Sequence, residues 1–385
     1  MSEIMRASRQ WASRPADERF WNVAELATKA RADRAASTEV VCELRQLKAS
    51  PVDDDLAILG PKGNPTRPTN WGFSQLCRLI GAPADYLTGL PANLAADCLN
   101  HGLTGNPEKV KVLLHRNGHT EIRAVTGDGY TRFWDSQVCE LLNPAIDNGW
   151  KVPPARPANY ADDTRCRPAT ADDLIPGMTG GAQVRVGETI APSGVYRGDR
   201  DSFVFLVNPT QSIDDGNGGG GLFKGIIASN SEVGKASIKF QAFCHEGVCG
   251  NHIIWGATNV VEMKRKHFGN LSGFLRDLRV WLTRWTGADT SKTTEMIAAA
   301  KRHVLGATYD DVEAKVKGLG LAALTLKAIK GSWDMAEKWE NTADATPNTA
   351  WGFVHGLTRY SQTLGFADLR QALDMAGGKI LNLAV

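Results

Sequence analysis

Four potential soft-metal ligands fall within nine residues of the stretch FCHEGVCGNHIIWG. They are Cys244, His245, Cys249 and His252. Closed zinc sites typically pair two closely spaced cysteines with two closely spaced histidines, and this order does not reproduce that arrangement. On a β-strand, Cys249 and Asn251 would share one face while His252 points to the other. We therefore expect a strand with a buried cysteine and no bound metal.

Two catalytic alternatives stay open for the same stretch. One is a metal-dependent enzyme such as a nuclease, with its site drawn from Cys244, Cys249, His252 and a nearby Glu232 or Glu246. The other is a nucleophilic Cys249 activated by His245, although the sequence offers no third group to orient the base. No cofactor is expected in the preferred interpretation.

The preferred interpretation makes this stretch structural. Cys249 is expected to be buried as a small apolar residue, and Gly250 to permit close backbone approach or a bulge. Asn251 is expected to bond a neighbouring backbone in the segment SNSEVG, around Asn230 and Glu232. These five residues form the predicted structural motif.

The segment YTRFWD suggests a different chemistry. On a strand, Tyr130, Arg132 and Trp134 would share one face, and a basic side chain between two rings is a common way to hold single-stranded nucleic acid. The alternative is ordinary core packing of the rings with the arginine reaching to the surface.

A local excess of positive charge follows further along the chain. Residues 262–303 hold nine Lys/Arg and four Asp/Glu, while the whole chain has a net charge of only +2. Apolar residues from Phe268 to Trp285 fall on an arc of roughly 140° of a helix. Arg265, Arg276 and Arg279 project from the opposite face and, with Lys264 and Lys266, form a predicted phosphate-binding stripe. A solvated helix face is the alternative.

Two other stretches favour loops over ligand sites. The glycines of DDGNGGGGLFKG run into a β-like segment, and Lys224 is followed by Gly225, unlike a phosphate-binding loop at the start of a helix. We expect a flexible connection between two strands. Asp53, Asp54 and Asp55 are expected to be solvated, with a divalent-ion site as the alternative.

The elements that position these residues indicate an α+β fold. Antiparallel hairpins are expected from KVKVLLHRNGHTEIRAV, continuing through YTRFW, and from the strand-like segments between 202 and 257. Helices are expected around Phe73–Ile80, after Pro91, behind the cap Asp135, and from Pro347 behind the cap Thr346. The expected domains are a helical and irregular N-terminal arm (1–68), an α+β core (69–261) and a helical C-terminal region (262–385).

Composition is ordinary for a soluble globular chain, with 42% hydrophobic and 22% charged residues. Seven scattered cysteines favour a reducing compartment, and no apolar run is long enough to span a bilayer. We expect a cytoplasmic protein without membrane contact.

Several motifs together resemble a known family. FSQLCRLIGAPADYLTGLP, RAVTGDGYTRFWD, FKGIIASNSEVGKASIKF, VCGNHIIWG and KHFG occur in the order found in the uncharacterised phage/plasmid-like protein family, catalogued as domain of unknown function nine-three-two. The resemblance covers roughly residues 70–270 and implies a mobile-element origin and an α+β core. A looser architectural similarity is to phage single-strand annealing proteins, which form rings and hold DNA in a basic groove.

The preferred function is therefore a non-enzymatic phage or plasmid protein that binds single-stranded DNA in recombination or replication. A homo-oligomer is expected with it, and a ring is one form that it could take. A protein-interaction module that counters host defence is a further alternative.

Overall fold

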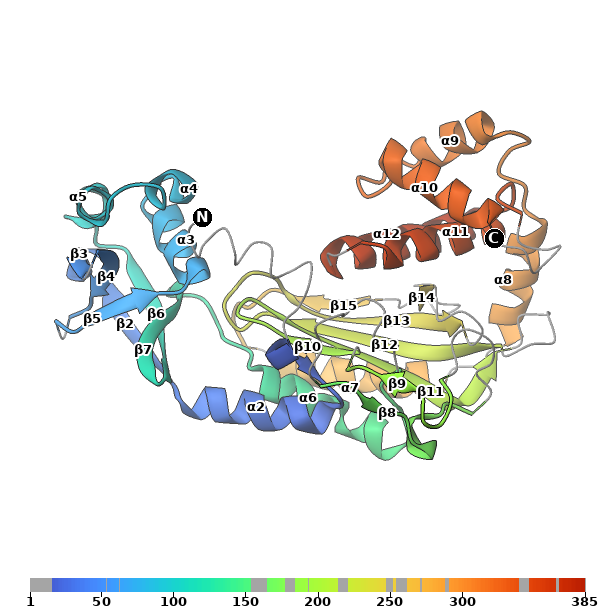
Figure 1. Ribbon diagram of the computed structural model, residues 1–385, viewed down its shortest axis with the longest axis horizontal. Helices are drawn as coiled ribbons and strands as arrows, with labels where there is room; N and C mark the ends of the chain where they lie inside the picture. The colour runs from blue at the N-terminus through green and yellow to red at the C-terminus, as the bar shows by residue number, and fades with distance from the viewer. Residues whose placement is uncertain are drawn as a thin grey trace.

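A computed structural model describes residues 16–52, 54–61, 63–153, 165–176, 184–192, 194–213, 221–246, 252–253, 262–270, 272–287, 291–338, 346–364 and 367–384. Within these ranges the chain has an α+β fold, with two larger sheets and several packed helices (Figure 1). No helix in the described ranges combines the length and the apolar character needed to cross a membrane.

The larger sheet is antiparallel and forms the centre of the molecule. Its strands follow the order β1-β10-β11-β12-β13-β14, and β15 pairs with β13 beside β14. Their bounds are β1 Arg19–Phe20, β10 Val195–Arg197, β11 Ser202–Ile213, β12 Leu222–Asn230, β13 Ile238–Glu246, β14 His252–Ile253 and β15 Glu262–Arg265. The long strands β11 to β13 confirm the predicted hairpins. The glycine-rich segment joins β11 to β12, as expected, although residues 214–220 lie outside the described residues.

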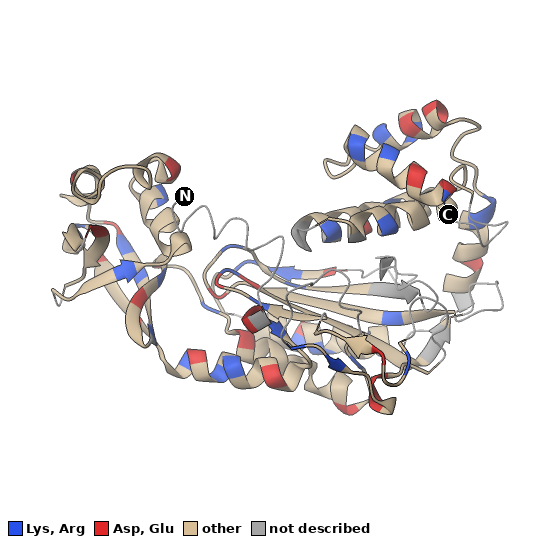
Figure 2. Cartoon of the chain, viewed as in Figure 1, with Lys and Arg blue, Asp and Glu red and all other residues tan. Residues whose placement is uncertain are grey.

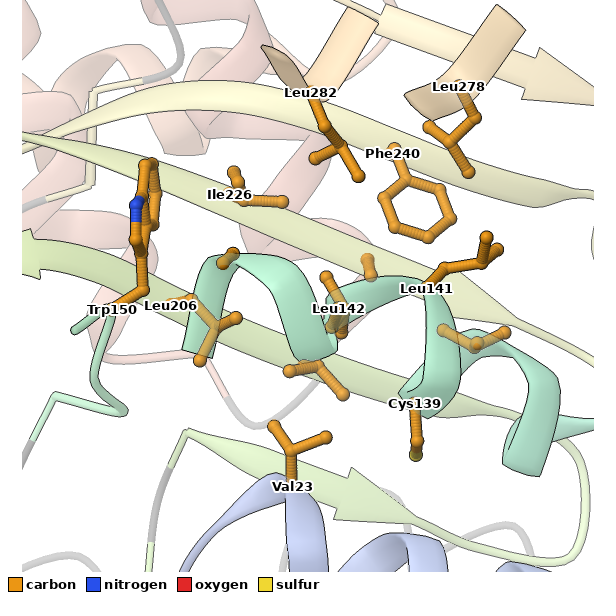
Figure 3. Close-up of a cluster of buried hydrophobic side chains, with 14 of the residues drawn as sticks. Val23, Cys139, Leu141, Leu142, Trp150, Leu206, Ile226, Phe240, Leu278 and Leu282 are labelled. Carbon is orange, nitrogen blue, oxygen red and sulfur yellow. The ribbon is translucent and has the colours of Figure 1, made fainter. Parts of the chain in front are cut away.

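Three helices pack under one face of this sheet: α2 (Val23–Ala35), α6 (Asp135–Asp147) and α7 (Ser272–Thr286) (Figure 1). Alternate strand residues such as Leu206, Ile226 and Phe240 point into the layer between strands and helices, where they meet Leu142 and Leu278 (Figure 3). Because neighbouring strand residues point to opposite faces, this alternation buries one full face of the sheet.

The second sheet lies in the N-terminal part of the chain and follows the order β2-β6-β7-β5-β4-β3. Its strands are β2 Ser37–Glu43, β3 Lys48–Val52, β4 Asp55–Leu59, β5 Pro65–Pro68, β6 Lys109–Asn117 and β7 His119–Gly127. Its helices are α3 Asn70–Leu79, α4 Ala84–Leu87 and α5 Ala92–Leu103. The predicted hairpin and helix pair are confirmed here, and Thr69 caps α3 by accepting from the Gly72 amide.

Helices of the C-terminal part form their own apolar cluster and extend over the other face of the large sheet (Figure 1). They are α8 Ser291–Arg302, α9 Tyr309–Lys317, α10 Leu326–Glu337, α11 Ala350–Gln362 and α12 Ala367–Leu381. Met375 of α12 packs with Phe223 and Ile227 of the sheet, which links the two parts. The remaining short elements are β8 Arg167–Pro168, β9 Thr189–Ile190 and the 3-10 turns η1 Ala16–Glu18, η2 Leu44–Gln46, η4 Ala171–Asp173 and η5 Asn382–Ala384.

Three local expectations differ from the structure. The described part of the N-terminal arm contributes β2 to β5 to a sheet, because their apolar residues pack against α3 and α5. YTRFW is not a strand, since only Tyr130 forms an isolated bridge, to Phe268. Strand pairing continues past Glu262 into β15, so the basic segment 264–266 is not helical.

Helix starts also differ in detail. The helix expected behind Thr346 begins at Ala350, where the Thr349 hydroxyl accepts from the Gly352 amide. At α6 the N-cap position is Trp134, and Asp135 is the first helical residue. The Asp135 carboxylate accepts a hydrogen bond from Arg197. The predicted apolar arc of α7 is confirmed from Phe274 onward.

Candidate nucleic-acid interface

A buried ionic cluster joins the two sheets, and we call its five members the ionic hub. They are Asp33, Arg123, Asp135, Arg197 and Glu232, each at most 9% exposed. The Arg197 guanidinium donates from Nε to Asp135 Oδ2 (2.8 Å), from Nη2 to Glu232 Oε2 (3.1 Å) and from Nη1 to Asp33. Arg123 Nη1 donates to the same Glu232 oxygen at 2.9 Å. The hub therefore connects β7, β10, α2 and α6.

Every charge of the hub has an opposite partner, as burial requires. Burial raises the pKa of Glu232, but the guanidinium groups of Arg123 and Arg197 outweigh it and hold that pKa below its ordinary value. Glu232 Oε1 also accepts from the Asp135 amide at 2.9 Å. The carboxylate is thus fully engaged in holding elements together.

Asn230, predicted as part of a structural motif with Glu232, lies beside the hub at 1% exposure. Its Nδ2 donates to the Phe133 carbonyl and to Asp135 Oδ1, both at 2.8 Å. The other three members of that predicted motif, Cys249, Gly250 and Asn251, lie outside the described residues.

The predicted aromatic clamp is an internal arrangement. The Arg132 guanidinium lies between the rings of Tyr130 and Trp134, 5.3 and 5.7 Å from their centres. Its side chain is 4% exposed and donates to Glu39 Oε2 (2.9 Å) and to the Glu232 carbonyl. These bonds occupy the guanidinium, so a phosphate would reach it only if they broke.

The residues that follow the basic segment 264–266 are anchored directly to this clamp. The ring of His267 stacks on Tyr130 with centres 5.1 Å apart, and its Nδ1 donates to the Thr131 carbonyl at 3.2 Å. Burial lowers the pKa of His267 to about 4, so the ring is neutral at pH 7. Two segments far apart in sequence, 130–134 and 264–268, are thereby held side by side.

Phe268 stands out on this surface. The prediction that Phe268 lies on the buried arc of a helix is wrong. Phe268 precedes α7 in the chain and is 67% exposed. It lies over Gly129, where a Cβ would come within 2.6 Å of the ring. An exposed ring seated on glycine next to three consecutive cations is available for contact with a flat ligand.

The predicted basic stripe is exposed throughout, and we call it the basic edge. Its members are Lys264, Arg265, Lys266, Arg276 and Arg279. Lys264 and Arg265 belong to β15 at the rim of the large sheet, Lys266 follows that strand, and Arg276 and Arg279 are exposed residues of α7 (Figure 1 shows the two elements, and Figure 2 shows Lys and Arg in blue in the same view). Within 262–287, six Lys/Arg face only two Asp/Glu, one of which, Asp277, lies 3.7 Å from Arg276.

A small cleft opens on the face of the large sheet away from α6 and α7. Its volume is about 260 Å³, and it is lined by Asp201, Phe203, Ser229, Asn230, Ala236, Ser237, Lys239 and Lys264. Apart from Asn230 and Lys264, these residues were not singled out from the sequence. Ser229 and Lys239 interrupt apolar neighbours in their strands, but other polar residues do so as well, so the sequence did not mark them.

The possible metal ligands are only partly covered by the structure. The β13–β14 register pairs the backbones of Cys244 with Ile253 and of His245 with His252, while Cys249 lies outside the described residues. Within the described residues, no group of His, Cys, Asp and Glu is arranged to hold a metal ion. Asp53 is also outside them, and Asp54 adopts a left-handed conformation (φ 62°) in the β3–β4 turn.

Comparisons with family models, with curated proteins and with solved structures found no match to this chain.

Proposed function

We propose that the chain is a nucleic-acid-binding protein that holds single-stranded DNA along the basic edge. The observation that supports this most is the exposed Phe268 ring two residues after the exposed cations Lys264, Arg265 and Lys266. Cations that meet phosphates and a ring on which a base can stack are the two components of sequence-tolerant single-strand binding.

Position along the fold supports the same proposal. Arg276 and Arg279 add two exposed cations on α7, the helix that follows β15 in the chain, so in this proposal a DNA strand meets both elements. Tyr130 would serve by holding the segment 264–268 in place, since its ring stacks on His267 and its hydroxyl donates inside the protein. Arg132 lies between the rings of Tyr130 and Trp134 and donates to Glu39, so it would support that arrangement.

Charged residues on an edge strand also discourage pairing with other chains, which is the competing explanation for Lys264 and Arg265. That explanation does not require the exposed Phe268 or the arginines on α7. A role in recombination or replication of a mobile element, with assembly of several copies on the strand, belongs to the same proposal.

The test is binding of a fluorescent single-stranded oligonucleotide at low salt. We compare the parent with the triple variant Arg265→Gln/Arg276→Gln/Arg279→Gln and with a control in which the exposed Lys317, Lys327 and Lys338 become Gln. The triple variant should lose most of the affinity, while the control retains it. Equal affinity for all three proteins, or no binding by the parent, would refute the proposal.

A further inference from the structure

The cleft on the large sheet is built around one row of residues that crosses four strands. The register places Phe203 opposite Ser229, Ser229 opposite Lys239, and Lys239 opposite Lys264. All four line the cleft. The row thus presents an apolar ring at one end, a hydroxyl in the middle and two ammonium groups at the other end.

The pairing of Lys239 with Lys264 is unusual. Like charges directly opposite each other on neighbouring strands are destabilising, because their side chains are adjacent on the same face. Lys264 is exposed and makes no ion pair or hydrogen bond with the residues that the structure describes. The two lysines therefore place positive charge at the same end of the cleft, which favours an anion there.

Two hydroxyl donors accompany the lysines. Ser229 is 6% exposed, Ser237 is half-buried, and neither hydroxyl is hydrogen-bonded within the described part of the chain. Buried hydroxyls normally have a partner. Three donor groups, those of Ser229, Ser237 and Lys264, therefore converge on one cleft without a protein acceptor among the described residues.

The opposite end of the cleft has a different character. Asp201, which is 5% exposed, and the apolar ring of Phe203 line that end. A ligand that suits both ends has a multiply charged anionic group at the lysine end and a partly apolar group at the Phe203 end. Because ligand pockets usually span about 300–1,000 Å³, this cleft is small and matches one nucleotide unit at most.

From this arrangement we infer that the cleft binds the phosphate monoester of a nucleotide, with the phosphate at Lys239, Lys264, Ser229 and Ser237. The source is either a free nucleotide or the 5′-phosphorylated end of a nucleic acid. The inference deepens the proposed function, and it rests on that function only for the second source.

Calorimetric titration tests the inference with adenosine 5′-monophosphate, adenosine and inorganic phosphate. The monophosphate should bind more tightly than inorganic phosphate, and adenosine should not bind measurably. Since a hydrogen bond to a charged group contributes about 1.5–3 kcal/mol, Lys264→Gln should lower the affinity for the monophosphate by about 10- to 100-fold. Ser237→Ala should lower the same affinity by a smaller factor.

Lys235→Gln is the matched control. Lys235 is an exposed lysine in the turn between β12 and β13, which also holds Ser237, but it does not line the cleft. Lys264 and Ser237 are not buried, so the variants should unfold at the temperature of the parent. Absence of monophosphate binding, or equal binding by parent and Lys264→Gln, would overturn the inference.

Two oligonucleotides separate this inference from the proposed function. Preference for a 5′-phosphorylated over a 5′-hydroxyl strand, lost in Ser237→Ala, supports a nucleic-acid end as the ligand. Equal binding of both strands, together with no binding of the monophosphate, overturns the cleft site and leaves the basic edge standing. Binding of the monophosphate without binding of either strand supports the cleft site for free nucleotides and refutes the proposed function.

Discussion

Asp374 is a carboxyl group in the apolar layer between α11 and α12, and its ionisation should govern the stability of the C-terminal helices. It is 5% exposed, and its Oδ1 accepts from the Ser361 hydroxyl at 2.8 Å. Burial raises its pKa from 3.8 to about 8, against smaller opposing effects of Ser361 and Arg370. At neutral pH the folded protein therefore keeps this proton, while the unfolded chain has released it.

The sign and size of the pH effect follow from proton linkage. A raised pKa contributes stability that is complete below pH 3.8 and is lost as the pH rises toward 8. Each pH unit in that window costs about 1.4 kcal/mol, so Asp374 lowers the free energy of unfolding by about 4 kcal/mol between pH 4 and pH 7. Asp374→Asn keeps an acceptor for Ser361 and a donor in place of the carboxyl proton, but cannot ionise.

Urea unfolding of the parent and of Asp374→Asn, measured between pH 5 and pH 7, gives the difference directly. That difference should grow by about 3 kcal/mol in favour of the variant over this window. Asp277→Asn removes the same charge from an exposed position of α7 and should show no comparable trend. A stability difference for Asp374→Asn that does not change with pH would refute the assignment of a protonated buried acid.

Other substitutions test the packing and the hub. Glu232→Ala leaves two buried guanidinium groups without their shared partner and should cost about 3–5 kcal/mol, seen as a lower melting temperature with DNA affinity intact in the folded fraction. Leu278→Ala, under the large sheet, should cost about 2–5 kcal/mol in chemical unfolding, whereas an unchanged midpoint would mean that α7 does not pack there. Gly356→Ala should reduce helicity or solubility, because its Cβ would lie 2.0 Å from the Ser332 carbonyl oxygen where α10 crosses α11; normal circular dichroism and melting would contradict that close contact.

Much of the large sheet and of the β6–β7 hairpin could be predicted because its signal is local. Val110, Val112 and Leu114 alternate along one strand, and a turn separates them from Ile122. The helical arc of α7 is local in the same way. Such patterns report burial of one face regardless of what covers it.

Elements defined by remote partners had no such signal. β15 carries consecutive cations and becomes a strand only because β13 offers it an edge. The alternation of side chains in segment 130–134 predicts a strand. In the structure Arg132 instead donates hydrogen bonds to Glu39 and to the Glu232 carbonyl, and the segment is not a strand. Tertiary pairing overrides local preference in both segments.

The candidate site was predictable in part for the same reason. The exposed cations of the basic edge follow from charge counting, whereas Arg197 is one arginine in a short strand with nothing local to mark it as buried. The hub joins residues as far apart as Asp33 and Glu232, and the cleft depends on a register across four strands. Neither arrangement is visible along the chain.

The central claim, that the basic edge meets the phosphates of single-stranded DNA, is tested most directly by the salt dependence of oligonucleotide binding. Each phosphate contact with a single strand contributes about −0.7 to the slope of log K against log salt, so the five cations predict a slope of about −3.5 for the parent. Arg265→Gln/Arg276→Gln/Arg279→Gln should bring it to about −1.4 by the same rule. A slope near zero, or the same slope in both proteins, would contradict the claim.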